Sequence, residues 1–363
     1  MKIPYLPLRE LNERFTVQDE QAFKRVHASG RFIGGDEVQL FEKEFAGYCG
    51  VSNVVSTGNG LDALTIILLA EKQLGNLPEN AKILLPAHTY IATFLSIAHA
   101  GMQPVPVDVT ELLLSVENLK SQIDRVDGII AVDLYGKLVG DEVYAFAKAQ
   151  QKPIYCDSAQ SHGAINASGH RSGCLAKASA FSFYPTKNLG ALGDGGAITT
   201  NDSELARVAR QIANYGRENR FKNPLKGVNS RLDPIQAAFL RNRLLILDAD
   251  NAHRVAIAQR YFNEMTNDHV RLASADFLAH NAVHVFPVFV LDRAHFQDYL
   301  AQKGIETNVH YPLPPHLQEA FQELNDLSFP QTEYLHKTEV SLPCHPLLSD
   351  AEMSYIINAI NSY

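Results

Sequence analysis

The order of apolar and polar positions divides the chain into short predicted elements, starting with a helix near the N-terminus. Apolar side chains three or four positions apart, the spacing of one helical face, occur at Val38, Phe41, Phe45 and Tyr48. They belong to the stretch 17–48, which we expect to be helical. Gly50 follows it, and glycine commonly ends helices.

From residue 53 onward, short apolar runs alternate with amphipathic segments. The apolar runs predict strands at 53–56, 82–86, 103–108, 128–133 and 153–157. The segments between them predict helices near 61–71, 91–101, 115–124 and 141–150. This alternation favours right-handed crossovers and an α/β fold, with a sheet covered by helices on both faces. Two further runs, 178–183 and 195–200, predict strands at a mixed edge of that sheet.

The last third of the chain predicts a different arrangement. A loop is expected at 214–230. A long helix over 234–265 follows it, with Asp233 as the N-cap and Pro234 in the first turn. The apolar run 283–291 then opens a second unit of strands and helices that continues to the C-terminus.

Length and composition narrow the class of protein. The 363 residues exceed one domain of ~150 residues, so we expect a large domain at 1–250 and a small C-terminal domain at 251–363. With 32 Lys and Arg against 40 Asp and Glu, the net charge of −8 argues against nucleic acid as the main partner. No apolar run approaches the ~18 residues of a membrane span, and the early charged residues do not match a signal peptide. Four widely spaced cysteines predict reduced thiols, so we expect a soluble cytoplasmic protein.

Polar residues gather where predicted strands end, which is where open α/β sheets bind ligands. The sequence STGNGLDAL at 56–64 leads from a strand into a helix, whose free backbone amides can hold a phosphate. An ordinary turn, with Asp62 favouring the first turn of the helix, explains that sequence equally well. In PAHTYIA, Tyr90 follows a strand and either covers a flat cofactor or packs in the core.

Two further clusters carry charged side chains. Asp157 ends a buried strand in YCDSAQSHG, where it either holds a positive charge, such as a protonated ring nitrogen, or caps the next turn. Lys187 lies in the apolar, glycine-rich stretch FSFYPTKNLGALGDGG. Such surroundings lower the pKa of a lysine by desolvation, and only the neutral amine attacks a carbonyl. We therefore favour Lys187 as a nucleophile over the alternative of an ordinary surface lysine.

A basic loop stands out in this acidic chain. The cationic residues of 217–231 are Arg217, Arg220, Lys222, Lys226 and Arg231, against a single acid, Glu218. This excess suggests an anionic ligand such as a nucleotide diphosphate, although a solvated loop fits the charge equally well. His280 and His284 are four positions apart without an accompanying carboxylate, so no metal site is predicted.

Taken together and in order, these clusters resemble one family over essentially the whole chain. It is the DegT/DnrJ/EryC/StrS group of pyridoxal-phosphate-dependent nucleotide-sugar aminotransferases, within the aspartate aminotransferase superfamily. The matching stretches are FIGGDEVQLFEKEFAGYCGV, GNGLDAL, PAHTYIATFLSIAHAG, DSAQSHGA, SFYPTKNLGALGDGGAI, NSRLDPIQAAFL, GIETNVHYPLPPHLQ and SLPCHPLL. The resemblance implies the fold of that superfamily, a mixed, mostly parallel sheet between helices with a smaller C-terminal α+β domain. It also implies pyridoxal 5'-phosphate as cofactor and a homodimer with shared active sites.

The resemblance assigns roles to individual residues. Lys187 matches the lysine that binds the cofactor covalently, and Asp157 matches the carboxylate that pairs with the pyridinium nitrogen. The other implied cofactor contacts are Gln160 at the ring hydroxyl, Tyr90 stacked on the ring, the Gly60 and Leu61 amides and the Ser182 hydroxyl at the phosphate, and Asn229 from the other subunit. The implied substrate-binding residues are Tyr184, Lys222, Arg231, His310 and Tyr311. The family more often has Thr where this chain has Leu61, so a side-chain contact to the phosphate is lost there.

The resemblance also implies a reaction, the transfer of an amino group from L-glutamate to a nucleotide-linked keto-sugar with ping-pong kinetics. The run SFYPTKNLGALGDGG resembles members that act at C3, whereas members that act at C4 often carry His where this chain has Tyr184. We therefore expect a dTDP-linked 3-keto-6-deoxyhexose as acceptor, for surface polysaccharide (O-antigen) or antibiotic sugars. The alternatives are a 4-keto-sugar aminotransferase, a pyridoxamine-dependent sugar dehydratase with His in place of the lysine, and a non-enzymatic regulator.

Overall fold

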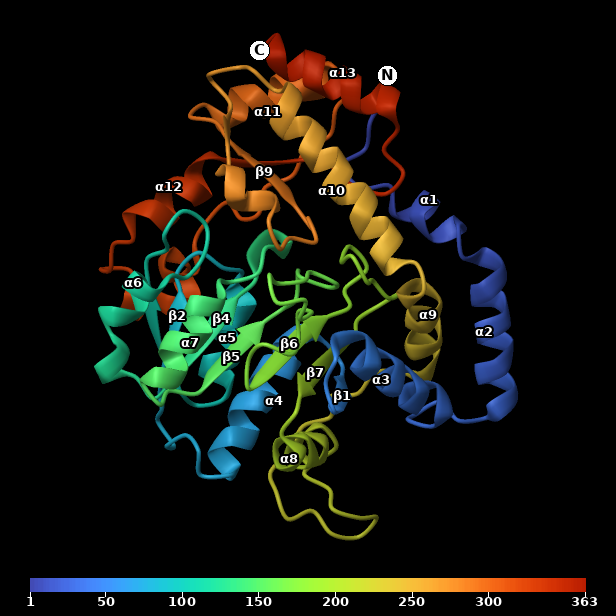
Figure 1. The fold of residues 1–363 in the computed structure, drawn as a ribbon. Coiled ribbons are helices and arrows are strands. Elements are labelled where there is room, and N and C mark those ends of the chain that lie inside the picture. Colours follow the sequence, from blue (N-terminus) through green and yellow to red (C-terminus); the bar gives the residue numbers. More distant parts are fainter.

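A seven-stranded sheet forms the centre of the molecule in the computed structural model, which describes residues 1–363 (Figure 1). The strand order is β1-β7-β6-β5-β4-β2-β3. The strands are β1 (Asn53–Thr57), β2 (Lys82–Pro86), β3 (Gln103–Val107), β4 (Gly128–Val132), β5 (Ile154–Asp157), β6 (Ala178–Ser182) and β7 (Gly196–Thr200). Pairing is parallel from β6 to β3, and β7 is antiparallel to both of its neighbours. The predicted mixed, mostly parallel sheet is confirmed.

The strands expected at a sheet edge lie inside the sheet instead. β7 pairs with β6 on one side and with β1 on the other, so β1 occupies the edge. All five residues of β7 are buried. The prediction of an edge was wrong because the pairing of β1 with β7 joins segments about 140 positions apart, as in the pair Val55 and Ile198. Local sequence carries no signal for such a pairing.

Successive strand residues enter different hydrophobic clusters, one on the first face of the sheet and two on the opposite face. Val55 and Ile130 pack in the largest cluster, while their neighbours Val54 and Ile129 belong to clusters on the opposite face. Side chains alternate across a strand, so this division shows that both faces are covered. Helices α4 (Gly60–Gln73) and α8 (Ser203–Ala213) contribute to the first face, and α3 (Asp36–Cys49) and α7 (Asp141–Ala149) to the second.

The helices predicted between the strands are all present. They are α4 and α7, α5 (Ile91–His99), and α6 (Val116–Lys120), which is shorter than predicted. The other helices are α1 (Leu8–Glu13), α2 (Thr16–Ser29), α9 (Pro234–Leu244), α10 (Leu247–Glu264), α11 (Arg293–Gln302), α12 (Pro330–Thr338) and α13 (Asp350–Asn361). None of the helices has the length and apolar character that crossing a membrane requires.

Two predicted long helices are each divided in two. The stretch 17–48 forms α2 and α3, because Gly30 ends α2 with a φ of 62°, in the left-handed region that glycine readily adopts. The stretch 234–265 forms α9 and α10, which separate near Leu245. Pro234 does open α9, but the Asp233 side chain makes no capping hydrogen bond.

A second, three-stranded sheet lies in the C-terminal third of the chain. It consists of β10 (Glu339–Leu342), β9 (Phe286–Phe289) and β8 (Arg271–Leu272), all antiparallel, and β9 falls within the predicted run 283–291. Figure 1 shows α10 running from α9 towards α11 and α13. The boundary placed at residue 250 falls inside α10, and the division into two domains stays a prediction.

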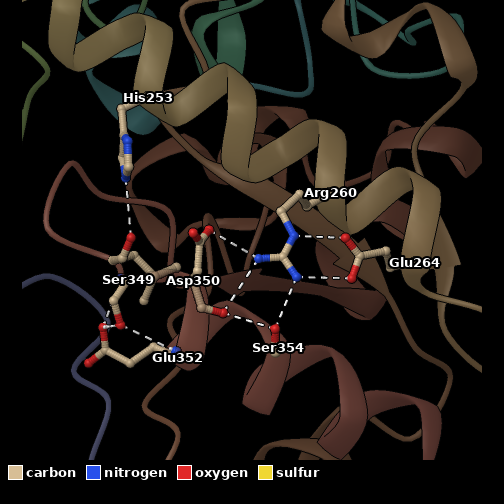
Figure 2. A network of polar contacts seen from close by, with 8 residues as sticks. His253, Arg260, Glu264, Ser349, Asp350, Glu352 and Ser354 are labelled. Carbon is tan, nitrogen blue, oxygen red and sulfur yellow. Dashed lines mark hydrogen bonds and ion pairs between the residues drawn. The ribbon is translucent and has the colours of Figure 1, made fainter.

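Polar contacts fix the C-terminal helix to α10 (Figure 2). Arg260 donates to both carboxylate oxygens of Glu264, at 2.7 and 3.0 Å. The same guanidinium donates to Asp350 at 3.3 Å and to Ser354 at 3.0 Å, at the start of α13. The single side chain of Arg260 therefore joins α10 to α13, the last helix of the chain.

Candidate active site

The candidate residues of four separate sequence clusters meet at one edge of the large sheet, namely the edge formed by the carboxyl ends of its parallel strands. β1, β2, β5 and β6 all end at this edge, because the antiparallel β7 returns the chain between β6 and β1. Gly60 follows β1 and Tyr90 follows β2. Asp157 is the last residue of β5, and Ser182 is the last residue of β6. The predicted gathering of polar residues at strand ends is thus present.

Asp157 is the buried carboxylate of the site. It is 8% exposed, and it accepts hydrogen bonds from Thr93 Oγ1 at 2.8 Å and from the Ala159 amide at 3.2 Å. Burial raises the pKa of Asp157, while these two donors and the charge of Lys187 act to lower it. Asp157 does cap the next turn, as the alternative predicted, because its Oδ1 accepts from the Ala159 amide. This contact uses only one oxygen, and the other, Oδ2, binds Thr93. Sequence reasoning missed Thr93, whose only signal is a hydroxyl on the first turn after a strand.

Lys187 is the amine of the site. Burial lowers the pKa of Lys187 to about 8, and the Asp157 carboxylate acts in the opposite direction. At pH 7 about one amine in ten is then neutral, against roughly one in three thousand for an ordinary lysine. Lys187 is half-buried, so it is not an ordinary surface lysine, and desolvation increases the neutral fraction that attacks carbonyl groups.

Three neutral imidazoles surround this amine. Burial, together with the charge of Lys187, lowers the pKa of His162 to about 3 and that of His310 to about 4. The same two causes hold the pKa of His284 well below its usual value. Asp157 is consequently the one charged group that stabilises protonated Lys187. From the sequence, His162 stood out only as a neighbour of Asp157, and His284 only in the pair with His280 for which no metal site was predicted.

The start of α4 forms a pocket suited to an oxyanion. The Asn59 side chain caps this helix by accepting from the Asp62 amide at 2.8 Å. The amides of Gly60 and Leu61 come first in the helix, and no acceptor in the protein binds them. A Cβ on Gly60 would come within 2.8 Å of Ser182 Cβ, so only glycine lets the helix approach that hydroxyl. These unbound donors beside a serine fit a phosphate group.

The aromatic residues of the site form a partly exposed wall. Tyr90 is 50% exposed, which contradicts the alternative that it packs in the core, and its ring centroid lies 4.8 Å from that of Tyr311. Gln160 Nε2 donates to the Tyr311 hydroxyl at 2.9 Å, and its Oε1 accepts from the Tyr135 amide at 2.6 Å. The amide of Gln160 thus positions two tyrosines, and its contact with a cofactor hydroxyl stays a prediction.

His310 is oriented by two residues of β10. Its amide donates to Glu339 Oε2 at 2.7 Å, and its Nδ1 lies 2.7 Å from Ser341 Oγ. Ser341 donates its own proton to Glu339, so its oxygen accepts from Nδ1–H and leaves Nε2 of His310 as the unprotonated nitrogen. Sequence reasoning missed Glu339 and Ser341, because only the pairing of the small sheet brings them to His310.

Lys222 and Asn229 lie in an exposed loop, whereas the Tyr184 amide donates to Ser182 Oγ at 3.3 Å and the Arg231 amide lies near Gly58, just before α4. The loop 214–230 lies beyond α8 in Figure 1, where Asn229 is exposed. Lys222 forms an ion pair with Glu218 at 2.6 Å, and Arg231 donates to Asn214 at 3.1 Å. Tyr184 is 52% exposed. The structure therefore groups Lys187, Asp157, Gln160, Tyr90, His310 and Tyr311 with the phosphate pocket, and leaves the basic loop at the surface.

Known proteins resemble this chain over its whole length. The model of the DegT/DnrJ/EryC1/StrS aminotransferase family matches residues 14–361. A dTDP-3-amino-3,6-dideoxy-alpha-D-galactopyranose transaminase of Aneurinibacillus thermoaerophilus is 43% identical, with 99% of each chain covered. A dTDP-3-amino-3,4,6-trideoxy-alpha-D-glucose transaminase of Streptomyces venezuelae is 36% identical, covering 100% of this chain and 96% of the relative. The X-ray structure of S. venezuelae DesV in complex with a ketimine intermediate superposes with a TM-score of 0.93 at 36% identity, covering 99% of this chain and 98% of that chain.

The close approach of Gly60 to Ser182 generates a prediction about cofactor binding. In Gly60→Ala the added methyl group meets Ser182 Cβ at 2.8 Å, so the start of α4 must move away from the phosphate pocket. We expect the affinity of the apoprotein for pyridoxal phosphate to fall on the order of tenfold or more. Titration followed by the absorbance of the bound cofactor measures this change.

The matched control is Gly47→Ala, on an exposed face of α3 with open space around the new Cβ. It should leave the affinity for pyridoxal phosphate unchanged. Unaltered cofactor binding by Gly60→Ala would place the phosphate elsewhere.

Proposed function

Because the chain belongs to the DegT/DnrJ/EryC1/StrS aminotransferase family, we propose that it transfers an amino group from L-glutamate to C3 of a dTDP-linked 3-keto-6-deoxyhexose. The observation that carries this proposal is the 43% identity, along the whole chain, to a transaminase named for a dTDP-3-amino-3,6-dideoxyhexose. The 36% identical relative is also named for a dTDP-3-amino sugar. Tyr184, where members acting at C4 often carry His, supports the same position.

Pyridoxal phosphate, when bound, supplies an electron sink for the carbanion that forms when a substrate carbon loses its proton. The residues present fit this cofactor: the amides of Gly60 and Leu61 with the Ser182 hydroxyl would hold its phosphate, and Asp157 would keep its ring nitrogen protonated. Tyr90 would cover the ring. These assignments are supported by the unbound donors of the phosphate pocket and by the burial of Asp157.

Lys187 supplies the acid–base group of the reaction. With a pKa of about 8, its Nζ both attacks a carbonyl in the neutral form and carries a proton in the charged form near neutral pH. Once the amino donor has displaced it, Nζ can take a proton from the substrate carbon. It can then deliver that proton to the cofactor carbon. The neutral histidines around it keep this proton on Lys187, because their lowered pKa values make them poorer acceptors.

The active site is completed by a second copy of the chain in this proposal. Asn229 would reach the phosphate of the partner subunit's cofactor, while Lys222 and Arg231 would contact the diphosphate of the nucleotide. The exposure of large apolar side chains in the same loop supports an interface there, with Phe221 at 88% and Val228 at 40% exposed. A dimer in the cytoplasm, serving surface-polysaccharide (O-antigen) or antibiotic-sugar synthesis, fits such a reaction.

The position of amination is tested with purified protein and two acceptors. L-Glutamate should first remove the yellow colour of the cofactor-loaded enzyme. A dTDP-3-keto-6-deoxyhexose should then restore the colour and yield an amino sugar, while the 4-keto isomer should not react. Turnover of the 4-keto sugar alone would identify a 4-keto-sugar aminotransferase. Protein that never acquires colour with pyridoxal phosphate would contradict the aminotransferase reading, and Lys187→Ala should abolish transfer.

The shared site is tested by combining two variants in one dimer. Lys187→Ala lacks the amine, and Asn229→Asp places a negative charge where a phosphate is expected. If Asn229 acts on the partner's site, the mixed dimer contains one site with both changes and one intact site. Co-expression under two affinity tags should then give mixed dimers with about half of the wild-type activity per dimer. Mixed dimers no more active than the better parent, or a monomer in sedimentation, would exclude this arrangement.

A further inference from the structure

A buried arginine beside the site lacks an anionic partner. Arg254 on α10 is 5% exposed, and its one hydrogen bond runs from Nη1 to the Cys344 carbonyl. Asp250, one turn earlier, accepts two hydrogen bonds from Arg14 at 3.0 and 2.7 Å. Arg14 therefore occupies both oxygens of this carboxylate, and Arg254 forms no ion pair with it. A buried cation without a counter-ion is unfavourable, so the arrangement suits an anion that arrives with a ligand.

Arg254 lines two adjoining cavities. The larger, of about 280 Å³, is also lined by Asn308, His284 and His310. The smaller, of about 50 Å³, is lined by Arg254 together with Lys187. Thr186 lines both cavities, so Arg254 lies where the space beside His310 meets the space beside the amine.

The polar lining of the larger cavity favours a small anion. His284 and His310 are neutral, and the Asn308 amide lies 3.5 Å from His310 Nε2. The one acidic side chain of the lining, Glu306, is about half exposed and pairs with Lys2 at 3.5 Å. Across the two cavities together, the cations Arg14, Lys187, Arg243 and Arg254 outnumber the acids Asp250 and Glu306, so their combined lining carries a positive net charge. The volume of the larger cavity lies below the ~300–1,000 Å³ of pockets for larger ligands, which suits an amino acid better than a nucleotide sugar.

We propose that Arg254 binds a carboxylate of the amino donor in this cavity and so directs the donor's amine towards Lys187. This inference rests on the proposed aminotransferase function. It adds a substrate-binding residue that stands in none of the motifs read from the sequence. The planar guanidinium can present two parallel N–H groups to a carboxylate, which a lysine cannot do. The Asn308 side-chain amide, which lines the same cavity, can donate a further hydrogen bond to the carboxylate.

The test separates the donor half of the reaction from the sugar half. In Arg254→Gln, the L-glutamate concentration that gives half-maximal loss of the yellow colour should rise roughly thirtyfold or more. The KM for the nucleotide sugar, measured with enzyme already aminated, should stay within about threefold of the wild type. Arg254→Lys keeps the charge but loses the paired donors, so its L-glutamate requirement should lie between those of the wild type and Arg254→Gln.

The matched control is Arg260→Gln, six positions along the same helix, where the arginine pairs with Glu264 and does not line the cavity. It should leave both halves unchanged. Should Arg254→Gln fail to fold, Arg254→Lys carries the comparison. Glutarate should also compete with L-glutamate for the wild type and lose that effect in the Arg254 variants.

Three outcomes would overturn the proposal. The first is an unchanged L-glutamate requirement in the folded Arg254 variants. The second is a rise only in the KM for the nucleotide sugar, which would assign Arg254 to a phosphate. The third is a wild type that L-glutamate does not bleach. Failure of the proposed sugar amination is distinguishable, because bleaching by L-glutamate is measured without any sugar.

Discussion

The interaction of two opposite charges, the buried carboxylate of Asp157 and the partly buried amine of Lys187, is the constraint on which the site depends. Burial alone raises the pKa of Asp157 and lowers that of Lys187, and each charge opposes the shift of the other. The outcome is a carboxylate that stabilises the charged amine through its electrostatic field, and an amine with a pKa of about 8. Because an unpaired buried charge costs several kcal/mol, removing either partner changes the protonation of the other.

The topology of the sheet brings this pair together. β5 and β6 are parallel neighbours, with Asp157 opposite Ala180, so the carboxylate and the segment leaving β6 towards Lys187 emerge side by side. The antiparallel β7 then lets β1 end at the same edge, which places Gly60 against Ser182. Phosphate pocket, carboxylate and amine therefore follow from one strand order. Arg254 on α10 lines a cavity together with Lys187, and in our proposal it binds the amino donor there.

The sequence was informative where function depends on local pattern. The alternating strands and helices, and the polar residues at strand ends such as Asp157 and Lys187, were predictable because burial and strand termini leave short-range signals. The break at Gly30 has a local signal, the glycine itself, that was not used, whereas the break near Leu245 and the inner position of β7 depend on packing between distant segments. The partners that orient the site were missed for the same reason. Thr93 and Glu339 come into contact with Asp157 and His310 only through tertiary structure.

The most direct test of the coupled charges is the titration of Lys187 in the apoprotein, with and without its partner. Nuclear magnetic resonance of labelled lysine side chains can follow the amine, assigned by its loss in Lys187→Ala. The wild type should titrate near pH 8. In Asp157→Asn the midpoint should move lower, because the carboxylate that favours the charged amine has been removed. A wild-type midpoint near the ordinary value of ~10.4, or an unchanged midpoint in Asp157→Asn, would contradict the account.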